Sequence, residues 1–570
     1  MKTKHAVLIG CGALLIILVL AFILGFFIGF KPQGSKKLSP DSWLVLDPSG
    51  NVADYNELSS SRLWGSPRPS TEDICRKIRF AASDKRIKGI LIKPSFAQIS
   101  FANLGEIGLA MEDFKAAGKP VYSHFSMQDQ KGYLLCAMAD SVYMEPSASA
   151  GLILEGVEAN LLFYKDLLSK LGIRMHVVQV GEFKGYDELY TKSALSPGTE
   201  QNLRQALKGR YDLLVGDLAK HRKLDPAQAL QIYEERPEVI LLPAEAKKYG
   251  LVDELASYDA LLDKLQITKD NRVSLKDYQD TAASTHKNKI AILNLSGVIT
   301  PSISGFSSEA TINAEKVDRA IRSIKKDKNI KALVVRLNSP GGSALESEII
   351  FQKLDQLELP VVVSMGGIAA SGGYYISCAG DYIVADPHTI TGSIGVVSTL
   401  PEGEELSKKI GLGSQTISYG KFAGSYTFWE KTDPEFLSSF ERYSKSVYDE
   451  FKLRVSTSRK LNEEEIAAAA EGRVFIAEDA RKLKLIDEVG SLQTAVNKAA
   501  ELAKITDYEL TQYPGKISIF EFIKQSGMFE MAVKYIRDKD MSLTERLEEY
   551  LKLCFPPQQC LYILPYNLDQ

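Results

Sequence analysis

Two glycine-rich motifs in the second half of the chain carry the residue types of a nucleophilic site. The first is Ser339-Pro340-Gly341-Gly342-Ser343 and the second, farther along, is Ala369-Ala370-Ser371-Gly372-Gly373. Each follows an apolar run typical of a buried strand. A serine at the turn from a strand into a helix is presented for attack on a carbonyl, and glycines let backbone N–H groups approach the oxygen that becomes negative. The motifs therefore predict a serine hydrolase with Ser371 as its nucleophile.

A serine hydroxyl needs a proton acceptor, and the sequence offers two candidates. His388 lies in a loop-like Asp-Pro-His-Thr segment, whereas Lys184 ends the β-rich run Val177-Val-Gln-Val-Gly-Glu-Phe-Lys184 in the first half of the chain. Burial lowers the pKa of a lysine because desolvation disfavours the ammonium form, so a buried lysine can act as a base. The alternative is that Lys184 is a surface charge, as most of the 69 Lys and Arg residues are. We expect Lys184 to be the base.

The chain contains two divergent copies of one unit, which the matching segments define. These segments are Leu46–Val52 with Leu293–Ile299, Gly89–Lys93 with Ala332–Arg336, Lys119–Ser123 with Leu359–Val363, and Asp140–Pro146 with Asp381–Pro387. Each copy alternates short β-rich runs with amphipathic helical segments. This alternation predicts a mostly parallel sheet with crossover helices in each copy.

The two copies differ at the residues that carry the chemistry. Counting from the matched aspartates, Gln130 of the first copy stands where the second copy has Ser371. Aligning the Phe-x-Gly steps places Ala423 of the second copy opposite Lys184 of the first. One copy thus has the serine without the lysine, and the other has the lysine without the serine. We expect an active site between two domains.

Length and composition indicate a multidomain protein with a membrane segment. A chain of 570 residues is too long for a single core, and a net charge of −3 gives no reason to invoke nucleic acid. The stretch from Ala6 to Phe30 is free of charged residues and long enough to span a bilayer, so we expect an uncleaved transmembrane anchor. Lysines flank both of its ends, so the positive-inside rule leaves the orientation open.

Cysteine and histidine usage gives no support for a metal or another cofactor. The six cysteines lack metal-ligand spacing, and the six histidines are scattered. Cys554 and Cys560 are close enough in sequence to close a small disulfide loop in an oxidising compartment, and two reduced thiols are an equally good interpretation.

An ordered set of motifs resembles the signal peptide peptidase A family of S49 serine peptidases, in its long, two-copy, membrane-anchored form. The set is Asn338–Ser343, Ser364–Tyr374 and Thr391–Gly395, and the first copy fits through Gly181–Lys184 followed by Ser196-Pro197. The resemblance covers nearly the whole chain.

The resemblance implies an α/β fold, a tandem repeat of two Clp protease/crotonase-like α/β superhelix domains after one N-terminal transmembrane helix. It also implies a homotetramer in the bacterial cytoplasmic membrane, with its catalytic body on the periplasmic side, that degrades signal peptides. The implied site is a Ser/Lys dyad of Ser371 (nucleophile) and Lys184 (general base), an oxyanion hole from the amides of Gly372 and of Gly341 or Gly342, and Ser393 orienting the lysine. Glu182 would hold Lys184 protonated if it faced inward.

The repeat sets the expected boundaries: tip and anchor 1–41, lysine-bearing domain 42–287, serine-bearing domain 288–513 and a helical tail 514–570. Two rival interpretations keep the fold but change the function. A crotonase-type acyl-CoA enzyme would use the paired glycine amides without needing Ser371. A catalytically inactive membrane scaffold would keep the fold alone.

Overall fold

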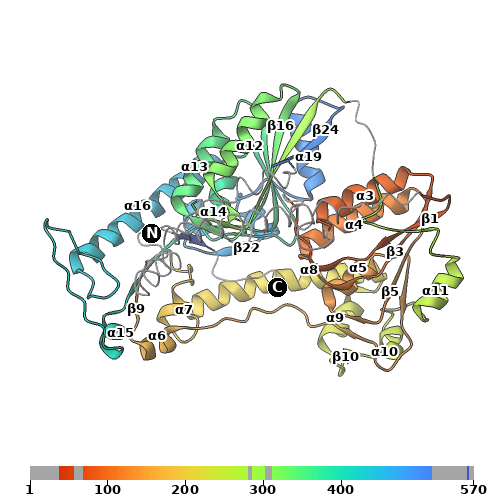
Figure 1. Ribbon diagram of the computed structural model, residues 1–570, viewed down its shortest axis with the longest axis horizontal. Helices are drawn as coiled ribbons and strands as arrows, with labels where there is room; N and C mark the ends of the chain where they lie inside the picture. The colour runs from red at the N-terminus through yellow and green to blue at the C-terminus, as the bar shows by residue number, and fades with distance from the viewer. Residues whose placement is uncertain (1–37, 57–68, 280–285, 302–310, 516–560, 564–570) are drawn as a thin grey trace, which may run out of the picture.

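The computed structural model describes residues 38–56, 69–279, 286–301, 311–515 and 561–563, which form two α/β domains (Figure 1). The expected anchor and the cysteines of the proposed disulfide loop lie outside these residues. Within the described parts of the chain, no helix combines the length and apolarity needed to cross a bilayer.

Each domain is built on a parallel sheet, and the two sheets have the same strand order. In the first domain the order is β11 (Glu254–Leu255), β7 (Ser141–Met144), β5 (Val121–Phe125), β3 (Ile87–Ile92), β1 (Ser42–Leu46) and β12 (Arg272–Ser274). In the second it is β23 (Glu488–Val489), β19 (Tyr382–Ala385), β18 (Val361–Ala370), β16 (Ile330–Ser339), β13 (Lys289–Ser296) and β24 (Glu509–Tyr513). The repeat seen in the sequence is therefore a repeat of topology.

The helices connect these strands in the crossover pattern that a parallel sheet requires. The first domain has α3 (Thr71–Ser83), α4 (Phe101–Ala116), α5 (Gln130–Ala137), α6 (Lys165–Leu171), α7 (Glu188–Thr191), α8 (Pro197–Arg222), α9 (Pro226–Glu234), α10 (Pro243–Lys248) and α11 (Tyr258–Leu265). The second has α12 (Ala314–Lys326), α13 (Ala344–Asp355), α14 (Gly372–Ser377), α15 (Glu404–Lys409), α16 (Pro434–Arg459), α17 (Glu463–Ala469), α18 (Ala477–Lys482) and α19 (Leu492–Leu502).

Equivalent hydrogen bonds recur in the two domains. Asp140 accepts from the Val121 N–H at 2.8 Å, and Asp381 accepts from the Val361 N–H at 2.8 Å. The hydroxyl of Tyr133 donates to the carbonyl of Leu251, and that of Tyr374 donates to the carbonyl of Leu485, both at 2.7 Å. The tyrosines place Gln130 and Ser371 at equivalent positions, because each stands three residues before its tyrosine.

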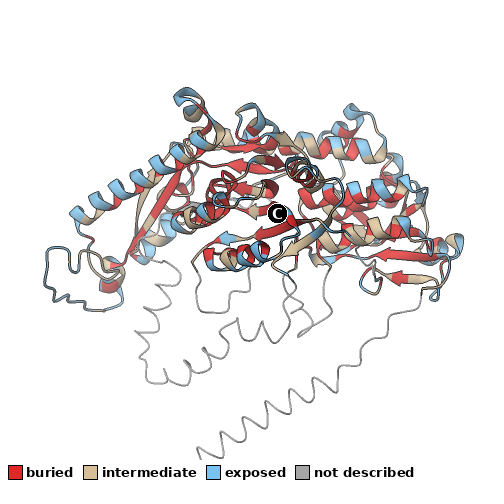
Figure 2. Ribbon diagram, turned by 90° about the horizontal axis from the view of Figure 1, so that it is seen from above, coloured by how far each residue is buried: buried red, intermediate tan, exposed pale blue. Residues whose placement is uncertain are grey.

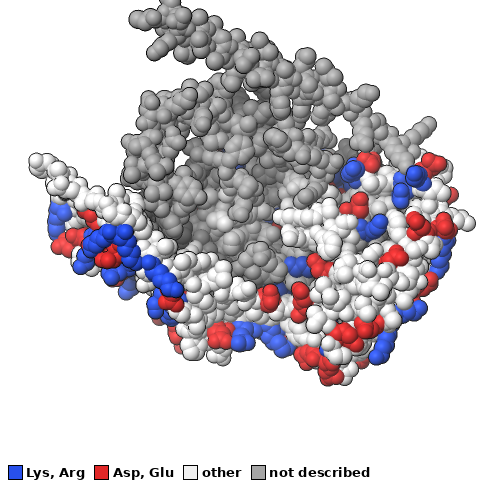
Figure 3. All heavy atoms as spheres, turned by 60° about the horizontal axis from the view of Figure 1, so that its bottom comes forward, with Lys and Arg blue, Asp and Glu red and all other residues white. Residues whose placement is uncertain are grey.

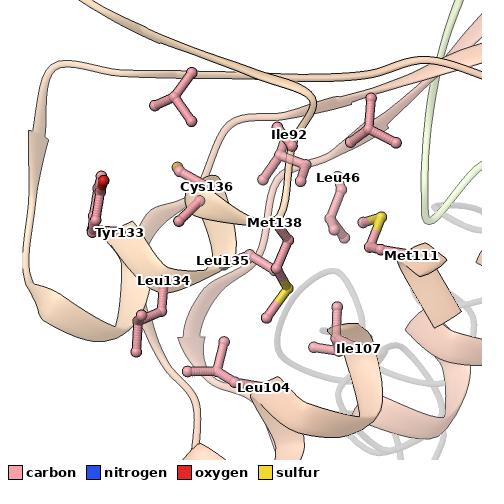
Figure 4. Packing of buried hydrophobic residues seen from close by; sticks show 14 of the residues in the cluster. Leu46, Ile92, Leu104, Ile107, Met111, Tyr133, Leu134, Leu135, Cys136 and Met138 are labelled. Carbon is pink, nitrogen blue, oxygen red and sulfur yellow. The ribbon is translucent and has the colours of Figure 1, made fainter. Parts of the chain in front are cut away.

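The sheets are buried on both faces, as expected for parallel strands covered by helices. Buried residues concentrate in the strands and on the inner faces of the helices (Figure 2). In the first domain, Leu46 and Ile92 from the sheet pack with Leu104, Ile107 and Met111 of α4 (Figure 4). The second domain has a corresponding cluster between its sheet and helices α12 to α14.

The domains are joined by a long helix and by a shared sheet. Helix α8 packs against β22 (Val474–Ile476), which pairs antiparallel with β20 (Ile390–Gly392), and Asn202 of α8 exchanges two hydrogen bonds with the backbone of Val474. Strand β9 (Arg174–Val180) leaves the first domain and pairs antiparallel with β21 (Val396–Glu402) of the second. This crossing brings the segment that follows β9 into the second domain.

The shared sheet has the order β15 (Thr311–Ile312), β14 (Val298–Ile299), β17 (Gly341–Ser343), β25 (Leu561–Ile563), β21 and β9. Two small sheets complete the fold: β2 (Ser49–Asn51) with β4 (Ser95–Gln98), and β10 (Ile240–Leu241) with β8 (Gly151–Ile153) and β6 (Met127–Gln128). Of the expected helical tail, residues 514–570, the structure describes 514–515 and 561–563, and the last three form strand β25. Its backbone pairs with strands on both sides.

Acidic and basic side chains are interspersed over the described surface on the face that Figure 3 presents. On this face, the described residues show no extended field of one sign of the kind that attracts a polyanion.

Candidate active site

Ser371 stands between a buried strand and a helix, as its sequence position predicts. Strand β18 ends at Ala370 and helix α14 begins at Gly372. Ser371 itself has φ 56° and ψ −118°, a conformation that costs a non-glycine residue roughly 1–3 kcal/mol. Its N–H donates to the carbonyl of Gly392 at 2.8 Å, which holds this strained turn against β20. The side chain is fully buried.

Lys184 reaches Ser371 from the other domain. Its Nζ lies 2.6 Å from Ser371 Oγ, 2.6 Å from the carbonyl oxygen of Ser393 and 2.8 Å from Ser393 Oγ. The lysine side chain has no exposed surface. Burial lowers the pKa of Lys184 well below its ordinary value, because the ammonium form loses its hydration.

The three contacts fit a neutral amine. A neutral amine has two N–H groups and one lone pair. The two oxygens of Ser393 can take both protons, which leaves the lone pair directed at the hydroxyl of Ser371. With the amine neutral, the serine O–H can donate to Lys184 Nζ, which is the starting geometry for transfer of its proton.

Glu471 and Gly472 of the second domain hold the loop that carries Lys184. The carbonyl of Glu471 accepts from the Phe183 N–H at 2.7 Å, and its carboxylate accepts from the Glu182 N–H at 3.1 Å. Gly472 has φ 80°, and a Cβ built there would come within 2.7 Å of Lys184 Cα. Only a glycine lets the two backbones approach this closely.

Gly342 and Gly372 lie close together beside the turn that carries Ser371. Gly341 and Gly342 have φ 106° and 151°, and a Cβ on Gly342 would overlap the carbonyl oxygen of Ile299. A Cβ on Gly372 would lie 3.2 Å from the Gly342 N atom, so this amide lies beside the turn that carries Ser371. The Gly341 N–H donates to Ser339 Oγ at 3.1 Å. Of the two amides, that of Gly342 is therefore the better placed to receive an oxyanion.

The structure also locates the residues that competed for these roles. His388 Nε2 lies 2.9 Å from Asp217 Oδ2, and its ring stacks on Phe101, so these side-chain contacts are with the first domain. Glu182 is exposed and does not face inward. Lys421, two positions from the residue aligned with Lys184, is 69 % exposed and pairs with Glu435 at 3.0 Å.

Sequence reasoning missed the supporting residues. In the sequence, Glu471-Gly472 is typical of an ordinary turn at the end of an apolar helix, and this turn is the one local signal that the pair gives. Nothing local indicates that this turn packs against a lysine from the other domain. Ser339 belongs to a glycine motif, but the sequence does not indicate that its hydroxyl accepts a hydrogen bond from the Gly341 N–H.

Comparison with known proteins places the chain in a family. The model of peptidase family S49 matches residues 113–272 and 353–506, once in each domain, and the Clp protease model matches residues 306–389. Protease 4 of Haemophilus influenzae is 32% identical over 85% of this chain and 83% of its own length. The chloroplastic serine protease SPPA of Arabidopsis thaliana is 29% identical over 82% of this chain and 70% of its own length. A putative signal peptide peptidase SppA of Enterococcus faecium is 30% identical over 40% of this chain and 67% of its own length.

The fold and these matches define the class as a serine peptidase with Clp protease-like domains. The chain belongs to peptidase family S49, in the two-domain architecture of the Protease 4 and SppA proteins. The acyl-CoA interpretation is therefore dropped.

Substitution of Gly472 by alanine should abolish peptidase activity while the fold is retained. The added Cβ would press on the backbone of Lys184 and move its amine away from Ser371. Gly411→Ala is the matched control, because Gly411 has φ 74° but nothing lies within 4 Å of its added Cβ. The measurement is kcat/KM on a peptide substrate, with circular dichroism as the folding check. Equal activity of the two variants would contradict the packing argument.

Proposed function

We propose that this protein is a membrane-anchored serine endopeptidase that uses Ser371 as nucleophile and Lys184 as general base to degrade cleaved signal peptides. The observation that carries the dyad is the 2.6 Å separation of Lys184 Nζ and Ser371 Oγ inside a fully buried site. The burial matters as much as the distance. An exposed lysine would be protonated at neutral pH and could accept no proton.

The residues divide the reaction as follows. Lys184 takes the proton of Ser371 as Oγ attacks the peptide carbonyl, and the amides of Gly372 and Gly342 stabilise the tetrahedral oxyanion. Each such donor is worth roughly 3 kcal/mol in the transition state. Lys184 then protonates the leaving amine, and water hydrolyses the acyl-enzyme. Ser393 acts as a positioning residue, since its two oxygens fix the amine.

Support for the substrate comes from the relatives and from the sequence. The Enterococcus faecium relative is a putative signal peptide peptidase. The uncharged segment from Ala6 to Phe30 would hold the enzyme at the membrane, where signal peptides remain after cleavage. We propose that the catalytic domains face the periplasm, on the side where those peptides are released.

The repeat supports assembly of several chains. In the second domain β21 pairs with β9 of the first. The equivalent of β21 in the first domain is the segment 155–161, and the equivalent of β9 in the second is 413–419, as the left-handed Gly172 and Gly411 after α6 and α15 align. Neither segment is a strand here, and 413–419 is exposed throughout. Pairing 413–419 of one chain with 155–161 of the next would repeat the β9–β21 contact and close a ring, which we propose is the homotetramer.

Ser371→Ala and Lys184→Arg should both abolish cleavage of a signal peptide substrate, because arginine cannot be deprotonated at accessible pH. Lys421→Arg, at an exposed lysine, is the control and should retain activity. A fluorophosphonate probe should label Ser371 in the wild type.

The kcat/KM of the wild type should fall as pH drops through the lowered pKa of Lys184, since protonation removes the base. Absence of labelling would support an inactive scaffold, and an activity limb at the ordinary lysine pKa of about 10.4 would contradict Lys184 as base.

Deletion of residues 1–37 should release the protein from membranes into the soluble fraction while leaving both domains intact. The reason is that the uncharged segment lies wholly within the deleted part. Membrane flotation of the full chain and of the deletion variant measures this. Equal membrane association of the two proteins would contradict the anchor.

Ile417→Pro should disrupt the tetramer, because proline removes a backbone N–H from the pairing segment. Ile417→Val keeps that N–H and favours a strand, so it serves as the matched control. Light scattering after size-exclusion chromatography should give the mass of four chains for the wild type and the control, and a smaller mass for Ile417→Pro. A tetramer in all three would show that the chains associate elsewhere.

A further inference from the structure

Strand β18 has a bulge shortly before Ser371. The pairing of β18 with β16 shifts register at this point, where one residue of β16, Asn338, stands opposite three residues of β18, 366–368. A bulge bends its strand and redirects the residues that follow it. Ser371 comes three residues after the bulge, at the turn from β18 into α14. The bulge therefore sets the direction in which the backbone enters the turn of the nucleophile.

The side chain of Asn338 holds this bulge in place. Its Oδ1 accepts a hydrogen bond from the N–H of Ile368 at 3.1 Å. A Cβ built on Gly366 would lie 3.3 Å from the Cβ of Asn338, so the side chain packs directly against the bulged backbone. Asn338 also immediately precedes the glycine motif of residues 339–343. One side chain thus links the backbone that leads to the glycine amides with the backbone that leads to Ser371.

An aspartate of the first domain fixes the other end of this amide. Asn338 Nδ2 donates to Asp54 Oδ2 at 2.8 Å, across the boundary between the domains. Asp54 is 8 % exposed, and its carbonyl accepts from the Glu72 N–H in the first turn of α3. A carboxylate only accepts hydrogen bonds and a backbone N–H only donates them, so a single orientation of the amide satisfies both partners. Asp54 therefore determines which way the amide of Asn338 faces.

Arg336 makes a buried carboxylate tolerable at this position. It lies two residues before Asn338 on β16, and alternate residues of a strand share a face of the sheet. Its Nη2 is 3.8 Å from Asp54 Oδ1, and its Nη1 donates to Ser364 Oγ at 3.0 Å. A buried carboxylate without a positive partner is strongly unfavourable, and the guanidinium compensates its charge. The first domain can thus keep an anion against the amide of Asn338.

We propose that Asn338 and Asp54 are a pair of positioning residues for Ser371, so that the first domain supports the nucleophile in addition to supplying the base. The proposal rests on the function assigned to Ser371 and Lys184. The loop after β9 brings the amine of Lys184 to the site. By a separate route, Asp54 acts through the amide of Asn338 on the bulge of β18. Both routes use the same contact between the domains, so the nucleophile and the base are aligned together.

Exchange of the two side chains tests this proposal. Asn338→Asp places a second carboxylate against Asp54, and their repulsion should turn the side chain away from the bulge. We expect kcat to fall between about tenfold and a hundredfold with KM nearly unchanged, because a small displacement of a reacting group costs this much. The double variant Asp54→Asn, Asn338→Asp exchanges amide and carboxylate, keeps the net charge and allows both hydrogen bonds again, so it should recover most of the lost kcat.

Two outcomes of this exchange would overturn the proposal. One is a fully active Asn338→Asp variant, since the orientation of the amide would then have no effect on Ser371. The other is a double variant no more active than Asn338→Asp, because a loss through the contact with Asp54 must be reversed when that contact is restored.

A second variant keeps the test decisive if Asn338→Asp fails to fold. Asp54→Ala removes the acceptor of the Asn338 amide and should slow fluorophosphonate labelling of Ser371 roughly tenfold, with circular dichroism as the folding check. Asp212→Ala, at an exposed aspartate of the same domain, is the matched control and should label at the wild-type rate. Equal labelling rates of these two variants would overturn the role of the pair. A wild type that takes no label would instead overturn the function assigned to Ser371, on which the pair depends.

Discussion

The site depends on burying an amine without an acidic partner. Lys184 has no exposed surface, and burial alone lowers its pKa. A carboxylate in contact would stabilise the ammonium and remove the base. The surroundings supply instead the neutral oxygens of Ser371 and Ser393, which hydrogen-bond an amine without favouring its charge as strongly as an anion does. Glu182 is exposed and does not face inward, so it leaves the amine without a carboxylate partner.

Meeting that constraint takes two domains. Neither copy of the repeat encloses the lysine, because Lys184 leaves the first domain on the loop after β9 and is covered by the second. The β9–β21 pairing, the contact of α8 with β22 and the bonds of Glu471 to that loop fix the approach. A buried ionic cluster between the domains, in which Arg336 lies 3.8 Å from Asp54 and 3.6 Å from Glu106, adds to this fixed orientation.

The two copies of the repeat have different residues, with different roles, at the position of Ser371. Gln130 stands where the second domain has Ser371, and its side-chain amide exchanges hydrogen bonds with the backbone of Gly156 at 2.8 and 3.0 Å. That position in the first domain now closes a loop. The second domain, in contrast, has backbone strain at its site, since Ser371 and Ser393 both have a positive φ, of 56° and 55°. Such strain persists where the surrounding structure over-determines the backbone, as it does around a reacting group.

The sequence by itself determined the repeat, the parallel sheets and the serine at its turn, because hydrophobic period, turn residues and the glycine motifs are local properties. It also singled out Lys184, by comparing the copies at Ala423. Only the tertiary structure decided that Lys184 is buried, that Gly472 makes room for it, and that residues 561–563 form a strand beside Gly342. Each of these depends on segments far apart in the chain, and no local pattern encodes which distant backbone will lie against a residue.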